Sequence, residues 1–336
     1  MQNKIQDISC YFPDTILTNE HLQKEFPKLK LPELTRLTGV TGRHICAHNQ
    51  TSLDMAVAAA EKLFKTSKTK KEDVDLIIFC SAGGDYITPA SSCIIHDKLN
   101  LPANCGAFDY NQGCTGYIYG LSMADSFISA GNANVVLLIT SEAITKTINK
   151  NDSSNRAIFG DAATASIIVK ENKPNNFGRF IFGTDGSKFD KIIIKYGRER
   201  FPLAKYSEYH EIDSYGNTIN NANFYMDGSA VFNFSVSKAP ELVSQLLEEA
   251  RLSFVDIDFF LFHQANQIIL ETIGRKLKVP KSKLIIDIEN TGNTVSSTIP
   301  IALHNALLTG RIAHGSTVLI AGFGVGFSWG GTILVV

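Results

Sequence analysis

The second half of this 336-residue chain repeats the pattern of the first half, and this repeat constrains the fold more than any single motif. The apolar run 74–81 resembles 257–264, the segment 98–102 resembles 276–280, and 109–131 resembles 287–310. Equivalent positions are about 180 residues apart, which is far longer than the ~20–50 residues of a solenoid unit. The sequence therefore predicts two duplicated halves that pack face to face.

Both halves have the pattern of an α/β fold. The segment 5–12, which ends at Pro13, and the apolar runs 74–81, 135–140 and 165–169 are predicted strands. Helices are predicted at 19–26, 52–64 and 89–99. Asn19 and Thr51 are the expected N-caps of the first two helices. Apolar strands that alternate with helices indicate sheets covered by helices on both faces. The first half is predicted to span 1–170, and the second 171–336.

The segment 171–225 breaks the repeat. It is polar and rich in Lys, Arg, Tyr and Asn, and it begins with Lys173-Pro174-Asn175-Asn176. A disordered linker is one interpretation, but its aromatic residues and the strand-like run 191–195 argue against it. We expect 171–225 to connect the halves and to cover a site, and 226–336 to form the rest of the second half.

A glycine-flanked cysteine is the leading candidate for a nucleophile. Asn111-Gln112-Gly113-Cys114-Thr115-Gly116 precedes a run with apolar residues at helical spacing, so Cys114 is expected at the start of a buried helix. Free N–H groups and partial positive charge at a helix N-terminus favour the thiolate, which is the nucleophilic form. A buried structural cysteine is the alternative interpretation.

The repeat supplies two partners for Cys114. It aligns Cys114 with Asn293, and it aligns Cys80 with His263, each at the carboxyl end of a strand. Ligands of α/β sheets bind beyond such strand ends, so Cys114, His263 and Asn293 are expected in one crevice. Singly, His263 has the pattern of a structural histidine and Asn293 that of a helix cap. Together, Cys, His and Asn form a known set for acyl chemistry.

A glycine-rich turn near the end of the chain has the pattern of a loop that lines a site. A strand leads into Gly322-Phe323-Gly324-Val325-Gly326, and a second strand follows. Such a turn can direct backbone N–H groups at a carbonyl oxygen and so form part of an oxyanion hole. A plain hairpin is the alternative.

Composition argues against several other classes of protein. The net charge is −1 and no apolar run has the length of a membrane span, so we expect neither nucleic acid nor a membrane as partner. All six cysteines lie between positions 10 and 114, which favours reduced thiols in a cytoplasm, and no signal segment precedes them. Neither the spacing of a zinc site nor a nucleotide-binding motif is present.

Six motifs in a fixed order resemble the thiolase superfamily, and within it the ketoacyl-acyl-carrier-protein synthase III enzymes. They are Leu37-Thr38-Gly39-Val40 with Arg43-His44, Asn111-Gln112-Gly113-Cys114-Thr115-Gly116, Ile158-Phe159-Gly160-Asp161-Ala162-Ala163, His263-Gln264-Ala265-Asn266, Gly292-Asn293-Thr294 and the segment 322–330. Thiolases use a second, late cysteine, and elongating synthases usually have a histidine where Asn293 stands. The set Cys114, His263 and Asn293 therefore selects the synthase III type.

The resemblance implies a layered α-β-α-β-α fold, a homodimer in the cytoplasm and no cofactor or metal. It implies that Cys114 takes an acyl group from acyl-CoA or acyl-carrier protein. His263 and Asn293 then assist decarboxylation of malonyl-carrier protein, and backbone N–H groups of Cys114 and Val325 hold the oxyanion. The expected substrate-binding residues are Arg36, Thr88, Arg156, Asn266, Phe323 and Gly324.

The sequence departs from the family pattern where CoA would dock. The usual Trp and Arg are missing near 33–37, Gln267 or Ile268 replaces an Arg, and Thr88 replaces a Phe before Pro89. Arg156, Lys205 and Lys278 are candidate phosphate contacts, although each alone has the pattern of a solvated surface residue. Two alternatives stay open: an acyltransferase that uses a hydroxyl or amine acceptor, and a non-catalytic subunit that binds carrier protein.

Overall fold

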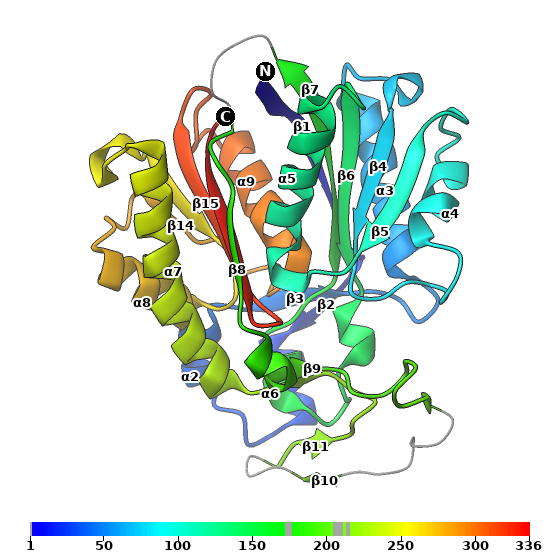
Figure 1. Ribbon diagram of the computed structural model, residues 1–336. Coiled ribbons are helices and arrows are strands. Elements are labelled where there is room, and N and C mark those ends of the chain that lie inside the picture. The colour runs from blue at the N-terminus through cyan, green and yellow to red at the C-terminus, as the bar shows by residue number, and fades with distance from the viewer. Residues whose placement is uncertain (1, 172–176, 204–210, 213–215) are drawn as a thin grey trace.

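Two five-stranded sheets and the helices around them form five layers (Figure 1). The computed structural model describes residues 2–171, 177–203, 211–212 and 216–336. The motif 173–176 and Lys205 lie outside the described residues. Helices α5 and α9 lie between the sheets, α3 and α4 cover the outer face of the first sheet, and α7 and α8 cover that of the second. The layered α/β fold predicted from the sequence is confirmed.

The first sheet takes all its strands from the first half of the chain. Across the sheet they are β1 (Gln2–Tyr11), β7 (Ala162–Glu171), β6 (Val135–Glu142), β4 (Leu76–Cys80) and β5 (Gly106–Tyr110). The strand β4 pairs in parallel with β5 and β6, whereas β1 and β7 pair antiparallel. The outer helices are α3 (Ser52–Thr66) and α4 (Ser91–Lys98). Because β5 has one neighbour, its other edge is free among the described residues.

The second sheet has its parallel strands and its antiparallel strands in a similar arrangement. Its order is β14 (Leu284–Ile285), β13 (Phe259–Phe262), β15 (Thr317–Gly324), β16 (Ser328–Val335) and β8 (Ile181–Thr184). The strand β13 is parallel to β14 and β15, and β16 is antiparallel to β15 and β8. Its outer helices are α7 (Gly228–Ala250) and α8 (Gln267–Leu277).

The two central helices join the sheets into one core. Helices α5 (Gly116–Ser129) and α9 (Thr298–Leu308) are apolar on most faces, as expected for helices buried between two sheets. One hydrophobic cluster contains Leu121 of α5, Leu303 of α9, Leu138 of the first sheet and Ile320 of the second. We propose that the boundary between the duplicated halves lies near residue 170, as the repeat predicts.

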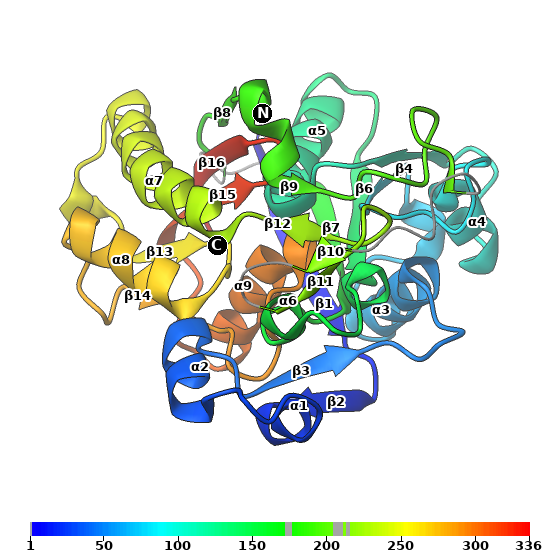
Figure 2. The ribbon, with the colours of Figure 1, turned by 90° about the horizontal axis from the view of Figure 1, so that it is seen from below.

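Three short ladders and three small helices lie at the lower end of the sheets in Figure 1. The ladders pair β2 (Thr15–Thr18) with β3 (Gly42–Ile45), β9 (Ile192–Ile193) with β12 (Tyr225–Met226), and β10 (Glu211–Ile212) with β11 (Thr218–Ile219); the helices are α1 (Asn19–Glu25), α2 (Leu31–Thr38) and α6 (Ser153–Arg156). Seen from below, β9 and β12 lie in front of the sheet ends and the central helices (Figure 2). This places part of the segment 171–225 beside the ends of both sheets.

The two predicted N-caps have different outcomes. Thr51 caps α3 in a capping box with Asp54, as expected. The prediction that Asn19 caps the helix at 19–26 is wrong, because Thr18 caps α1 by accepting from the His21 N–H. The amide of Asn19 is buried instead, where it donates to the Val40 carbonyl and accepts from Arg43. None of the helices among the described residues is both long and apolar enough to cross a bilayer.

Candidate active site

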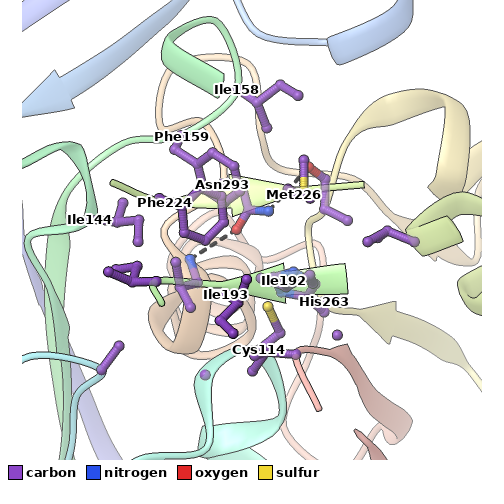
Figure 3. Close-up of a pocket in the computed structure, with 18 of the residues that line it drawn as sticks. Cys114, Ile144, Ile158, Phe159, Ile192, Ile193, Phe224, Met226, His263 and Asn293 are labelled. Carbon is purple, nitrogen blue, oxygen red and sulfur yellow. Dashed lines mark hydrogen bonds between the residues drawn. The ribbon is translucent and has the colours of Figure 1, made fainter. Parts of the chain in front are cut away.

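The predicted nucleophile and its two predicted partners lie around one cavity of about 400 Å³ (Figure 3). Cys114 comes from the turn before α5, His263 follows β13, and Asn293 precedes α9. The rest of the lining is mostly apolar and includes residues of the cover. The repeat therefore correctly predicted that these three residues meet in one crevice.

A glycine-containing turn holds Cys114 at the cavity. Gly113 has φ +50°, and a Cβ at this position would collide with the Val325 side chain. Residues 113–115 form a 3₁₀ turn that runs directly into α5. The Thr115 hydroxyl, fully buried, lies 2.9 Å from that of Ser328 and ties the turn to β16. Only glycine fits before Cys114, because both its backbone angle and its contact exclude a side chain.

The surroundings of Cys114 favour the thiol over the thiolate, contrary to the expectation drawn from the helix N-terminus. Burial raises the pKa of the Cys114 thiol to about 12, and the nearby Glu142 acts in the same direction. Hydrogen bonds from the backbone N–H groups of Val325 and Cys114 lower the pKa, but their effect is smaller than that of burial. Removing water from an anion thus outweighs the favourable N–H groups here.

His263 is a neutral, fully enclosed imidazole. Its side chain is 2% exposed, and burial lowers its pKa to about 3. Its backbone N–H donates to the Ala321 carbonyl, which fixes the residue beside β15. Its Nδ1 lies 2.7 Å from Oγ1 of Thr298, the first residue of α9. A neutral ring has one N–H and one free lone pair, so it can donate or accept one hydrogen bond at the cavity.

Asn293 is held by backbone pairing with the first half of the chain. Its N–H donates to the Ile158 carbonyl at 2.8 Å, and its carbonyl accepts from the Gly160 N–H at 3.1 Å. Gly292 precedes it with φ +66°. The side-chain oxygen accepts from the Val295 N–H, while Nδ2 makes one long contact of 3.4 Å to the Ala265 carbonyl. No described residue accepts from the second N–H of this amide, so it can donate to a ligand.

Three consecutive hydroxyl groups attach the start of α9 to both halves. The Ser296 hydroxyl donates to the Glu142 carboxylate at 2.8 Å, and the Ser297 hydroxyl lies 2.9 Å from that of Thr140 on β6. Thr298 contacts His263 in the second half. Burial raises the pKa of Glu142 to about 7, although Ser296 and the Ala82 N–H lower it. We call Ser296, Ser297 and Thr298 the hydroxyl run.

The glycine-rich turn between β15 and β16 lies against the nucleophile. A Cβ at Gly324 would lie 2.7 Å from both Cβ and Sγ of Cys114. The N–H of Val325 points at the Cys114 sulfur. Phe323, Gly324 and Val325 all line the cavity, as the sequence predicted for this turn.

The other predicted substrate-binding residues are dispersed. Asn266 lines the cavity and caps α8 by accepting from the Ile269 N–H. Thr88 is exposed and is absent from the lining. Arg156 is also outside the lining, and its guanidinium pairs with Glu25 at 2.6 Å. Arg36 lies with Lys278 in a second groove between α2 and α8.

The apolar wall of the cavity was not predicted from the sequence residue by residue. Phe159 and Phe224 pack edge to face at 5.1 Å, and Ile192, Ile193 and Met226 of the paired strands β9 and β12 complete the wall (Figure 3). The run of three isoleucines at 192–194 was the available signal, since it is the most apolar stretch of an otherwise polar segment. We call Phe159, Ile192, Ile193, Phe224 and Met226 the apolar wall.

Among the described ranges, no group of three or more His, Cys, Asp or Glu side chains lies close enough together to hold a metal ion.

Two duplicated α/β halves, with a cysteine before one central helix and an asparagine before the other, define a protein of the thiolase superfamily. The family model for 3-oxoacyl-(acyl-carrier-protein) synthase III matches residues 108–186, and the model for the C-terminal part of that synthase matches residues 247–336. The chain belongs to this synthase III family, as the resemblance predicted.

Individual relatives cover nearly the whole chain. The beta-ketoacyl-(acyl-carrier-protein) synthase III of Clostridium perfringens is 32% identical, with 98% of each chain covered. That of Coxiella burnetii is also 32% identical over 98% of each chain. A crystal structure of a 3-oxoacyl-(acyl-carrier-protein) synthase III aligns over 100% of both chains with a TM-score of 0.98 and 36% identity. A FabH from Pseudomonas aeruginosa aligns with a TM-score of 0.86 at 29% identity, covering 99% of this chain and 98% of the other.

Proposed function

We propose that this chain condenses a Cys114-bound acyl group with malonyl-carrier protein, with loss of CO₂, to give a 3-oxoacyl thioester for fatty-acid or related lipid synthesis. The observation that carries the proposal is a thiol, a neutral imidazole and a free amide N–H around one mostly apolar cavity. A nucleophile and preorganised donors are the two devices that such a reaction needs.

The first step transfers an acyl group from the sulfur of CoA to the sulfur of Cys114. The new C–S bond forms as the old one breaks, and the proton of the Cys114 thiol leaves with CoA as its thiol. The Val325 N–H and the N–H of Cys114 already point at the nucleophilic sulfur, so they are well placed for the oxyanion that develops beside it.

The second step breaks the bond between the malonyl carboxylate and its α-carbon. The electron pair of that bond becomes an enolate, and the negative charge collects on the thioester oxygen. His263 and Asn293 each donate one hydrogen bond to that oxygen, and the α-carbon then attacks the acyl group on Cys114. A neutral His263 suits this role, because a buried cation would cost several kcal/mol of desolvation.

The apolar wall supports an acyl chain as the group on Cys114. Phe159, Phe224 and Val295 belong to a hydrophobic cluster that also includes the Cys114 side chain. A hydrocarbon chain attached to the sulfur would bury its surface against this cluster, which is worth ~25 cal/mol per Å² of apolar area.

Phosphate-bearing partners would approach over the groove between α2 and α8. Arg36, Arg275, Lys278 and Lys281 line this groove, with Glu271 as its one acidic lining residue. Gln267 and Ile268 lie in it too, where the family pattern has an arginine. We propose that these four cations replace that arginine in contacting CoA or the acidic carrier protein.

A homodimer, a cytoplasmic location and the absence of a cofactor complete the proposal. Among the described residues, one edge of β5 pairs with no other strand, and Ile87 in the loop before α4 is 87% exposed. A second copy that paired along β5 would cover the edge and this loop, including Thr88, and so remove two surfaces that favour aggregation.

Intact-protein mass spectrometry tests the proposal. Wild type and Cys114→Ala are incubated with a panel of acyl-CoAs and acyl-carrier proteins, with and without malonyl-carrier protein. We expect an acyl mass increment on wild type only, and its loss when malonyl-carrier protein is added. An increment that persists until a hydroxyl or amine acceptor is supplied would indicate an acyltransferase instead. No increment with any donor would indicate a non-catalytic binding subunit.

A further inference from the structure

We propose that Thr298 is a positioning residue that makes His263 a hydrogen-bond donor: the Thr298 hydroxyl donates to Nδ1, so that the ring proton lies on Nε2 at the cavity. This inference rests on the proposed function, since it concerns the second step of that reaction. It adds a residue outside the three predicted ones and assigns a tautomer to the imidazole.

The contact between the two side chains is short and enclosed. Thr298 Oγ1 and His263 Nδ1 are 2.7 Å apart, and the two residues are 3% and 2% exposed. His263 lines the cavity, and no hydrogen bond from another described residue reaches its Nε2. One ring nitrogen is thus committed to Thr298, and the other is left for a ligand.

A hydroxyl has one proton, and two acceptors compete for that of Thr298. One is His263 Nδ1, and the other is the Val295 carbonyl, 3.1 Å from Oγ1. The backbone N–H of Thr298 already donates to the Val295 carbonyl, so this oxygen stays satisfied when the hydroxyl turns away. Nδ1 has no other donor among the described side chains, and leaving it unpaired in a buried site would cost ~1–3 kcal/mol.

The choice of proton position decides what His263 can do. With the hydroxyl proton on the Nδ1 side, the ring carries its own proton on Nε2, and it can donate to the malonyl thioester oxygen beside Asn293. With the opposite arrangement, Nε2 is a lone pair that would repel the developing negative charge. No proton is transferred to or from the ring in the decarboxylation, so one tautomer serves the whole step.

Threonine also keeps the imidazole neutral. A carboxylate at this place would favour the protonated ring and raise its pKa. The hydroxyl brings no charge, which agrees with the low pKa that burial gives His263. The ring can therefore be oriented without becoming a cation that binds the malonyl carboxylate and opposes its loss.

Two variants separate the hydroxyl from the methyl group of Thr298. Thr298→Val keeps the shape and removes the hydroxyl, whereas Thr298→Ser keeps the hydroxyl and removes the methyl. We expect Thr298→Val to lower decarboxylation of malonyl-carrier protein by up to ~10²-fold, near the cost of losing one preorganised donor. Thr298→Ser should retain the rate, and both variants should still form the acyl adduct on Cys114. A purely structural role predicts the reverse order, because valine fills the space better than serine.

The tautomer itself is measured on folded wild type by ¹⁵N NMR of histidine-labelled protein. The His263 signal is assigned by its loss in His263→Ala, and we expect an unprotonated Nδ1 and a protonated Nε2. A protonated Nδ1, a fully active Thr298→Val, or a Thr298→Ser as impaired as Thr298→Val would each overturn the proposal. A wild type with this tautomer but no decarboxylation would refute the proposed function instead.

Discussion

The turns that precede the two central helices and hold Cys114 and Asn293, here called the two corners, have the same architecture but different chemistry. Each has a glycine with positive φ, Gly113 or Gly292, directly before the functional residue. Each then enters a 3₁₀ turn and an apolar helix of the central layer. The first corner presents a thiol, which we propose as the nucleophile, whereas the second presents an amide, which we propose as a hydrogen-bond donor. The duplicated scaffold therefore fixes where side chains stand, and residue identity alone decides what they do.

The equivalent ends of strands β4 and β13, which hold Cys80 and His263, also differ in the side chain that they offer to the cavity. A Cβ at Gly116 would collide with the Cys80 sulfur, so the start of α5 lies directly on Cys80 and keeps it out of the cavity. At the equivalent strand end, His263 reaches the cavity and is held by Thr298 of α9. The second half therefore contributes two polar groups where the first half contributes one.

The largest expected effect comes from removing the chemistry of either corner. Cys114→Ala should reduce acylation to background, because no other described lining residue supplies a thiol. His263→Ala should leave acylation intact and lower condensation by ~10²–10³-fold, because one donor to the enolate is lost. Adduct mass and 3-oxoacyl product are measured in parallel. Equal loss of both half-reactions in His263→Ala would contradict the division of labour.

The protonation state of the first corner is tested by alkylation. The pKa of the Cys114 thiol is raised to about 12. At any pH below this pKa, the thiolate fraction rises about tenfold for each unit by which the pH is increased. The rate of modification by iodoacetamide should therefore rise by ~10³-fold between pH 7 and 10. Modification at Cys114 is read by peptide mass spectrometry, with Cys114→Ala as the control. A rate that levels off near pH 7 would mean that the resting enzyme holds a thiolate.

The two glycines test whether the corners act separately. Gly113→Ala adds a side chain that collides with Val325, and Gly292→Ala places a Cβ 2.6 Å from the Ile158 carbonyl. We expect the first variant to slow acylation and the second to slow condensation, each by ~10²-fold through displacement of the neighbouring functional residue.

Matched controls come from the far ends of the same helices. Gly131 and Gly310 also have positive φ, but a Cβ there would meet nothing within 4 Å. Gly131→Ala and Gly310→Ala should therefore share the backbone strain of ~1–2 kcal/mol and keep both half-reactions. Loss of activity in these controls would mean that strain alone, rather than displacement at the site, explains the first pair.

The smallest effect concerns Glu142, which connects the corners through Ser296. Its pKa is raised from 4.5 to about 7, so the folded state favours the protonated carboxyl. The unfolding free energy should then fall as pH rises from about 4.5 to 7, by about 3 kcal/mol relative to a residue that does not titrate. Thermal unfolding of wild type and Glu142→Gln at pH 5 and pH 8 measures this effect. We expect the glutamine variant to be more stable relative to wild type at pH 8 than at pH 5. A pH-independent difference would contradict the raised pKa.

The sequence predicted those parts of the site that lie in short motifs of the repeat. Cys114, His263 and Asn293 stand in short motifs that the repeat aligns, and their meeting follows from where parallel strands end. The apolar wall could not be located in the same way, because Ile192 and Met226 pair across a segment that has no counterpart in the first half.

Three further differences between prediction and structure have physical causes that only the fold contains. The sequence favoured a thiolate at Cys114 and the fold favours the thiol, because desolvation depends on what surrounds the sulfur, whereas the motif describes only the N–H groups. Thr298 was missed because its hydroxyl serves His263 across 35 positions of sequence. Asn19 and Thr18 are both capping residues by type, and the buried Arg43 recruits the amide of Asn19 and leaves the cap to Thr18.

The hydroxyl run also makes formation of the active site depend on packing between the two halves of the chain. Ser296 and Ser297 bind the end of β6 in the first sheet, while Thr298 holds the imidazole of the second. The donor corner can therefore form only after the two halves have docked in register. At low denaturant concentration, the catalytic rate should fall as the two halves separate and before the strands of either sheet unfold. The catalytic rate therefore reports how well the two halves of the chain are packed against each other.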